Sequence, residues 1–128
     1  MTRRVLSVGQ CTADHGGISR TLRGAFGAEV VPADSVPEAL ELLRQEAFAL
    51  VLVNRVLDAD HTPGLELVRQ VRADEALKAV PIMLVSNYAD AQAEAVAAGA
   101  APGFGKADLG RADMLERVRP FLTGTNSP

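Results

Sequence analysis

The stretch Leu50-Val51-Leu52-Val53-Asn54 decides the fold, because a continuous apolar run ends abruptly in one polar side chain. Strands that are covered by helices on both faces have such continuous Val/Ile/Leu runs, whereas half-exposed strands alternate. In open α/β sheets, functional groups collect just beyond the carboxyl ends of the strands. We therefore expect a buried central strand over residues 50–54, with Asn54 at the functional edge of the sheet.

The composition indicates one globular domain of common size. The chain has 128 residues, of which 48% are hydrophobic and 23% are charged. Its net charge of -3, with both signs scattered, argues against a nucleic-acid-binding surface. The single cysteine excludes an internal disulfide, and no signal-peptide pattern or membrane-length apolar run is present, so we expect a soluble cytoplasmic protein. We expect residues 1–122 to form the domain and residues 123–128 to form a flexible polar tail.

Strand-like runs and helical patterns alternate five times along the chain. This order predicts a parallel sheet with right-handed crossovers and helices on both faces, the (βα)5 doubly wound, flavodoxin-like three-layer α/β sandwich. Its usual strand order at this length is 2-1-3-4-5, which places Gly9 and Gln10 beside Asn54. The expected strands cover residues 5–8, 29–32, 50–54, 81–86 and 102–105.

Three sequence signals predict helix ends. Asp14 is a plausible N-cap for the first helix, and Ser35-Val-Pro-Glu38 has the pattern of a capping box before the second. Gly99 follows an alanine-rich helical segment at the place where a left-handed residue commonly ends a helix.

Several landmarks occur together in an order that is specific. Residues 48–54 are followed by Gly64-Leu-Glu-Leu67, residues 81–86 form an apolar run that ends in Ser86, and Gly99-Ala-Ala precedes Lys106 by seven residues. In these features the chain, up to about residue 122, resembles the receiver domain of bacterial two-component response regulators. The resemblance implies the fold described above and a role in signal transduction.

The chain departs from the receiver pattern at three acidic positions. In that family, two acids after the first strand and one after the third hold Mg²⁺, and the third acid accepts a phosphoryl group. Mg²⁺ prefers anionic oxygen ligands, and the acceptor must be an anionic nucleophile. The resemblance places Gly9, Gln10 and Asn54 at these positions. We therefore interpret the chain as a degenerate receiver, or pseudo-receiver, that is not an enzyme and uses no metal or cofactor.

Two other positions of the family's phosphorylation pocket are retained. The resemblance places Ser86 and Lys106 where a hydroxyl and an ammonium would contact the phosphoryl group. Without the acids, we expect Lys106 to pair with Asp58, Asp60 or a carbonyl, or to turn to water. Asn54 is expected to hydrogen-bond neighbouring loops and to fix them in one state.

Two residues near the lysine also differ from the family. Ala107 stands where the family has a proline, so we expect a trans peptide bond before it. Gly103 stands where the family has a Tyr or Phe that rotates on activation, so the usual coupling is expected to be lost.

The resemblance implies an output surface on the fourth helix, the fifth strand and the fifth helix. Our leading hypothesis is a phosphorylation-independent scaffold or signalling module that binds a protein partner there, with a second copy of the chain as one such partner. Tyr88 is the only tyrosine, and exposed aromatic residues are favoured at interfaces. The alanine-rich fourth helix would offer a surface of low relief. The candidate surface residues are Tyr88, Ala91, Ala95, Gly103 and Phe104.

Three other functions are considered. The main alternative is a domain that senses a small anion or metabolite through Ser86 and Lys106. Cys11 and His15 are four residues apart near a helix start, but no third group that would orient them for catalysis is evident. A metal site at Asp58, Asp60 and His61 is also disfavoured, because polar residues on one flexible loop are usually solvated.

Overall fold

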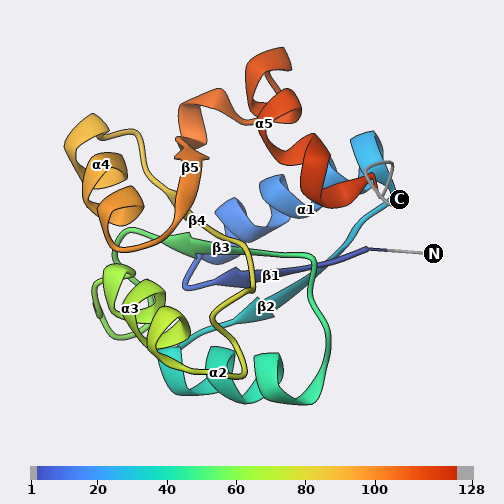
Figure 1. Ribbon diagram of the computed structural model, residues 1–128. Coiled ribbons are helices and arrows are strands. Elements are labelled where there is room, and N and C mark those ends of the chain that lie inside the picture. The colour runs from blue at the N-terminus through green and yellow to red at the C-terminus, as the bar shows by residue number, and fades with distance from the viewer. Residues whose placement is uncertain (1–2, 124–128) are drawn as a thin grey trace.

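The computed structural model describes residues 3–123, and residues 124–128 of the predicted tail lie outside the described residues. Strands and helices alternate along the chain, as predicted (Figure 1). The strands are β1 (Arg4–Val8), β2 (Glu29–Ala33), β3 (Leu50–Asn54), β4 (Ile82–Val85) and β5 (Ala101–Phe104). The helices are α1 (Thr12–Phe26), α2 (Val36–Gln45), α3 (Leu65–Ala73), α4 (Ala89–Ala97) and α5 (Ala112–Leu122), with a short 3-10 helix at Lys106–Asp108.

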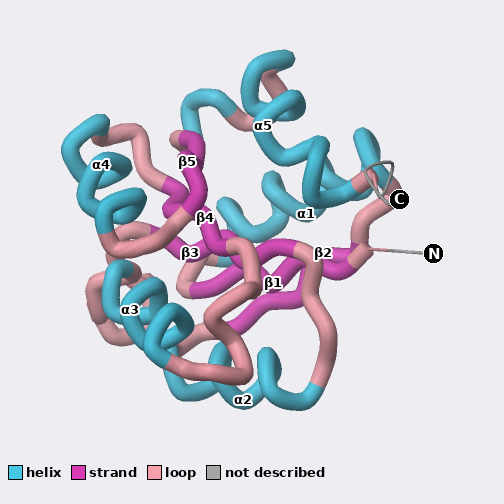
Figure 2. Tube along the Cα trace, viewed as in Figure 1, coloured by secondary structure: helices cyan, strands magenta, loops and turns pink. Residues whose placement is uncertain are grey.

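The five strands form one parallel sheet in the order β2-β1-β3-β4-β5, which confirms the predicted topology (Figure 2). The β1–β3 register pairs Val8 with Val53, so β3 ends one residue beyond β1 and Asn54 lies beside Gly9. The β4–β5 ladder is irregular, because Met83 pairs with Ala101 whereas Val85 pairs with Phe104. One extra residue of β5 is therefore accommodated at this edge of the sheet.

Helices cover both faces of the sheet, and this explains the continuous apolar run of β3. Val51 and Val53 belong to the core under α2, α3 and α4, whereas Leu50 and Leu52 belong to the core under α1 and α5. Figure 1 shows α1 and α5 on one side of the sheet and α2 and α3 on the other. Because successive side chains of a strand point to opposite faces, every residue from 50 to 53 is buried.

The start of α1 corrects one prediction. The N-cap of α1 is Cys11, whose Sγ accepts a hydrogen bond from the Asp14 backbone N–H at 3.5 Å. Asp14 is therefore not the cap but lies inside the first turn, because the helix begins at Thr12. A carboxylate in the first turn is favoured by the helix dipole.

The other two predicted helix ends are confirmed in position, although the second bond of the predicted capping box goes to Asp34 and not to Ser35. The Ser35 hydroxyl accepts a hydrogen bond from the Glu38 N–H at 3.2 Å, while the Glu38 carboxylate reaches back to the Asp34 N–H at 2.7 Å. Gly99 follows α4 with φ of 115°, a conformation that L side chains rarely adopt. None of the helices in the described range is both long and apolar enough to cross a membrane.

Candidate functional site

The carboxyl ends of β1 and β3 are tied together through one carbonyl. The Asn54 side chain donates a hydrogen bond from Nδ2 to the Gly9 carbonyl oxygen at 3.0 Å. The Asp58 backbone N–H donates to the same oxygen at 2.9 Å. Asn54 thus makes the kind of loop contact that its neutral amide predicts, and it fixes the loop after β3 against the end of β1.

Leu57 closes the site on the β1 side. Gly9 has φ of 74°, and a Cβ atom at this residue would lie 2.4 Å from the Leu57 Cγ and 2.9 Å from its Cα. Leu57 is itself completely buried. No side chain therefore fits at position 9 unless the β3–α3 loop moves. Leu57 was not among the predicted site residues, although it is the one large apolar residue after Val56 in an otherwise polar loop.

Gln10 is buried next to this closed strand end. Its side chain is only 8% exposed, and neither its Oε1 nor its Nε2 has a hydrogen-bond partner among the described residues. A buried amide without partners lowers stability, since it has given up its bonds to water. Gln10 is thus enclosed by protein and does not line the open hollow beside it.

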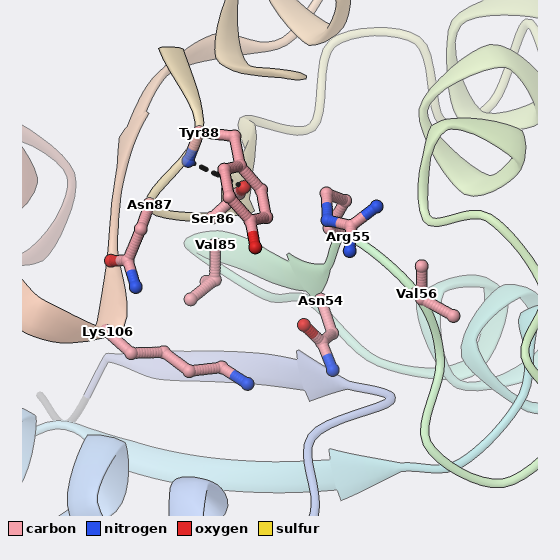
Figure 3. Close-up of a pocket in the computed structure, with 8 residues that line it drawn as sticks. All are labelled: Asn54, Arg55, Val56, Val85, Ser86, Asn87, Tyr88 and Lys106. Atoms are coloured by element: carbon pink, nitrogen blue, oxygen red, sulfur yellow. Dashed lines mark hydrogen bonds between the residues drawn. The ribbon is translucent and has the colours of Figure 1, made fainter. Parts of the chain in front are cut away.

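An open hollow of about 350 Å³ lies beside the end of β3 (Figure 3). Asn54, Ser86 and Lys106 all line it, so three of the five residues predicted for the degenerate pocket meet there. Gly9 and Gln10 do not line it, because Leu57 and the surrounding core enclose them. The remaining lining residues are Arg55, Val56, Val85, Asn87 and Tyr88.

Ser86 and Lys106 already have partners within the protein. The Ser86 hydroxyl accepts a hydrogen bond from the Tyr88 N–H at 3.1 Å, drawn as a dashed line in Figure 3. The Lys106 Nζ forms an ion pair with the Asp14 carboxylate at 2.6 Å. This bond lowers the pKa of Asp14 below its usual value. The Lys106 ammonium is therefore engaged within the protein, whereas the bond that Ser86 accepts does not use its own O–H.

The predicted partners of Lys106 were wrong. Asp14 is within reach because it lies in the first turn of α1, whereas the Asp60 carboxylate accepts a hydrogen bond from the Thr62 N–H at 3.0 Å. That backbone bond also holds the pKa of Asp60 below its usual value. Within residues 3–123, no group of three His, Cys, Asp or Glu side chains could hold a metal ion.

No protein-family model matches the chain, and no curated protein matches it. Solved structures do match. A response regulator from Thermotoga maritima is 26% identical, with 95% of this chain and 98% of that one covered and a TM-score of 0.77. The chemotaxis response regulator CheY4 of Vibrio cholerae is 23% identical, with 95% and 100% covered and a TM-score of 0.73. A candidate response regulator from Chloroflexus aurantiacus is 24% identical, with 95% and 98% covered and a TM-score of 0.83.

The chain has the receiver fold of response regulators. The similarity extends over nearly the whole chain and nearly the whole of these structures, so the receiver fold accounts for all the elements described above. Receiver domains are in general signalling modules that contact other proteins. The coarse prediction of a signalling domain is therefore supported by the fold.

A glutamine joins α4 to the last two strands of this receiver fold. The Gln92 Nε2 donates to the Leu84 carbonyl at 2.9 Å and to the Ser86 carbonyl at 3.1 Å, while its Oε1 accepts from the Gly103 N–H at 3.1 Å. The amide thus bridges β4 and β5 where their ladder is irregular. The sequence analysis missed this residue, although it is the only polar uncharged side chain of α4.

Gly103 has no room for the Tyr or Phe that the resemblance places at this position. A Cβ atom there would lie 2.1 Å from the Leu84 carbonyl oxygen and 3.0 Å from the Gln92 Oε1. The absence of a side chain is therefore required by the close approach of β4 and β5. All peptide bonds of residues 3–123 are trans, including the bond before Ala107, as predicted.

The candidate partner surface needs correction at three residues. Ala95 is completely buried on the inner side of α4. Phe104 is buried in the core under α1 and α5, and Gly103 is buried against Leu84. The spacing along α4 and β5 turns these residues inward. Tyr88 is 59% exposed, as expected of an interface residue, and Ala91 is partly exposed.

Cys11 and His15 lie at the start of α1 on the same side of the helix. The Cys11 thiol serves as the N-cap, and the His15 backbone N–H donates to the Cys11 carbonyl at 2.8 Å. The Cys11 thiol thus has a structural role in the first turn.

Proposed function

We propose that this chain is a pseudo-receiver, a receiver-fold domain that is not phosphorylated and that acts as a protein-binding scaffold or signalling module. The observation that carries the proposal is the packing of Leu57 over Gly9, next to the hydrogen bond from the Asn54 side chain to the Gly9 carbonyl. Gly9, where the resemblance places one of the acids that hold Mg²⁺, has no room for a side chain beneath Leu57. A hard cation has no anionic oxygen ligands at Gly9, Gln10 or Asn54.

The amide at the end of β3 also lacks the chemistry of a phosphoryl acceptor. An amide oxygen is a weak nucleophile, and its nitrogen lone pair is delocalised, so neither forms the acyl phosphate that a carboxylate would form. The Asn54 amide is in addition bonded to Gly9. Phosphoryl transfer therefore has no acceptor here.

Retained polar residues support the same proposal. Because Lys106 is paired with Asp14, the small-anion alternative has less support. The Gln92 amide ties α4 to β4 and β5, which favours a single, constitutive arrangement of this side of the domain. We propose the cytoplasmic signalling setting of the receivers that the chain resembles.

We place the protein partner on the α4-β5-α5 face. A hollow of about 430 Å³ opens between α4, β5 and α5. Val96, which is 44% exposed, lies there beside Ala97 and Pro102, with the Arg117 side chain at the edge. A small apolar centre with a charged edge is suited to a protein contact. A second copy of the chain is one such partner.

Beryllofluoride with Mg²⁺ tests the loss of phosphorylation, because this complex mimics a bound phosphoryl group. The amide resonances of residues 54, 86 and 106 should not move in an NMR titration up to millimolar concentration. Saturable shifts at these residues with micromolar affinity would overturn the proposal. CheY4 of Vibrio cholerae, which shares the fold, serves as the control for the reagent.

The α4-β5-α5 face is tested by Val96→Glu. Sedimentation velocity of the wild type and the variant measures whether the chain self-associates through this face. Affinity purification with both proteins then identifies heterologous partners, and those that use the face should be lost with Val96→Glu. Ala13→Glu, at an exposed site in the first turn of α1, is the matched control.

A further inference from the structure

A second hollow, which we call the α3–α4 groove, lies on the other side of α4 from the face considered above. Its volume is about 460 Å³, and its apolar lining includes Val56, Leu65, Leu84 and Ala91. Leu65 comes from the first turn of α3, and Ala91 comes from the first turn of α4. The groove therefore runs between the starts of these two helices and has an apolar floor of the size that takes one or two side chains.

One wall of the groove carries two acids that have no ion-pair partner among residues 3–123. Asp90 and Glu94 line the groove, are exposed and lie one helical turn apart on α4. Like charges at this spacing destabilise a helix, and α4 has no basic residue to compensate them. Within the described range, some acids elsewhere are paired, as Asp74 is with Arg44 and Glu116 with Arg119, whereas Asp90 and Glu94 are not. A basic group bound in the groove would relieve the repulsion.

The mouth of the groove carries an exposed aromatic ring in a defined position. Tyr88 is the most exposed large hydrophobic residue in the described part of the chain, at 59%. The Arg55 guanidinium lies over its ring, 5.0 Å from the centroid. Figure 3 shows both side chains projecting from their loops at the strand ends. An aromatic side chain that is already held in place loses little freedom when a partner packs on it.

We propose that the α3–α4 groove binds a basic amphipathic segment of a partner protein. An apolar side chain of the segment packs on Leu65 and Ala91, and a lysine or arginine beside it pairs with Asp90 and Glu94. Tyr88 covers the apolar contact from the mouth of the groove. The assignment rests on the proposed role as a protein-binding module. The groove shares Arg55, Val56 and Tyr88 with the hollow beside Asn54, but Leu65, Asp90 and Glu94 line neither that hollow nor the one between α4, β5 and α5.

Two synthetic peptides test the charge requirement. Both are helical 18-residue peptides with leucines at i, i+3, i+4 and i+7, and their remaining positions carry lysine in one and glutamate in the other. Fluorescence anisotropy with the 128-residue chain should show that the lysine peptide binds at least tenfold more tightly. Equal affinities would overturn the proposal.

Charge reversal separates the groove from the overall negative charge of the protein. Glu94→Lys should weaken binding of the lysine peptide at least tenfold. Glu41→Lys changes the net charge by the same amount at an exposed site on α2, and should change the affinity less than twofold. Equal losses in the two variants would mean that the attraction is not localised, and would overturn the proposal.

NMR mapping then distinguishes this proposal from the proposed function. The lysine peptide should move the amide resonances of Leu65, Ala91 and Glu94. Shifts centred on Val96 and Arg117 would overturn the proposal that the peptide binds in the groove, and would support binding at the α4-β5-α5 face. If the chain self-associates without peptide and Glu94→Lys abolishes this self-association, the occupant of the groove is a second copy of the chain. That result would overturn the proposal that a partner segment binds there. The beryllofluoride titration is independent of all these outcomes.

Discussion

Two regions differ in the surroundings of their polar groups: the ends of β1 and β3, and the outer side of α4. At the strand ends, the Gly9 carbonyl receives two hydrogen bonds and Leu57 fills the space above it. On α4, Asp90 and Glu94 face solvent without ion-pair partners among the described residues, next to the exposed ring of Tyr88. The closed contact between Gly9, Asn54 and Leu57 therefore contributes to the stability of this domain, although the buried Gln10 amide beside it has no partner among the described residues. The exposed charges that could recognise another molecule lie on α4.

The largest effect should come from Gly9→Ala, which tests how tightly the strand ends are closed. The new Cβ would overlap Leu57, and overpacking typically costs about 1–3 kcal/mol. The positive φ of Gly9 adds about 1–2 kcal/mol for an L residue. We expect urea denaturation to show a loss of several kcal/mol in the free energy of unfolding.

Gly24→Ala is the matched control, because a Cβ atom at Gly24 meets nothing within 4 Å and the residue is in α1. This variant should gain about 0.5–1 kcal/mol, since alanine favours helix over glycine. A Gly9→Ala protein as stable as wild type would show that the loop of Leu57 moves easily, and would remove the difference between the two regions.

Gln92→Ala should have the next largest effect, because it removes the link between α4 and the strands. The change leaves the Leu84 carbonyl and the Gly103 N–H without their side-chain partner. One buried group without a partner costs roughly 1–3 kcal/mol, so we expect a loss of about 2 kcal/mol in the free energy of unfolding. Hydrogen exchange at Gly103 should also become faster.

Gln70→Ala is the control for this variant. Gln70 is exposed on α3 and bonds only the Glu66 carboxylate, at 3.3 Å. Its loss should change stability by less than about 0.5 kcal/mol, as for most surface substitutions. If Gln92→Ala lowered the free energy of unfolding as little as Gln70→Ala, the Gln92 amide would not hold α4 in place. The proposal that α4 has a single fixed arrangement would then lose its main evidence.

The fold was predictable from the sequence because its signals are local and repeated. The continuous run of residues 50–53 indicated burial on both faces, and the strand–helix alternation predicted the parallel order that the sheet has. Ser35 was a recognisable cap because hydroxyl, proline and glutamate stand at fixed spacing. Cys11 was missed because a thiol is an uncommon cap, and the more usual residue, Asp14, stood three positions later.

The site was predictable only in part, since it depends on side chains that meet across loops. The predicted strand order correctly placed Asn54 near Gly9, because both residues lie at the ends of neighbouring strands. The predicted partner of Lys106 was wrong, because Asp14 is 92 residues away in sequence and only the tertiary fold brings the start of α1 close to the 3-10 helix after β5. The inward turn of Ala95 and Phe104 depends on the register of α4 and β5, which composition does not reveal.

A smaller effect is expected from Asn54→Asp, which restores an acid at the end of β3. The carboxylate has no N–H for the Gly9 carbonyl, so the bond of 3.0 Å is lost and two oxygens face each other. We expect a loss of roughly 1–2 kcal/mol at pH 7 by urea denaturation. Asn87→Asp is the matched control, because the Asn87 Oδ1 only accepts a bond from the Ala107 N–H, which a carboxylate retains. Equal losses in the two variants would show that the donor of Asn54 is unimportant.

The smallest effect is expected from Lys106→Met, which tests the ion pair at the edge of the closed site. Because Lys106 lowers the pKa of Asp14, the folded state favours the ionised carboxylate, and this stabilisation is present above the unfolded pKa of about 3.9. It is lost as the pH falls through the lowered pKa. The side chains are 40% and 32% exposed, so we expect a loss of only about 0–1 kcal/mol at pH 7, which shrinks in high salt. An NMR titration of Asp14 should show its pKa rising towards the usual value in Lys106→Met.

Lys78→Met, which removes the same charge from the exposed pair with Glu75, should leave the pKa of Asp14 unchanged. If Lys106→Met also left it unchanged, Asp14 would not be the partner of Lys106 in solution, and an ammonium would be available to the hollow beside Asn54.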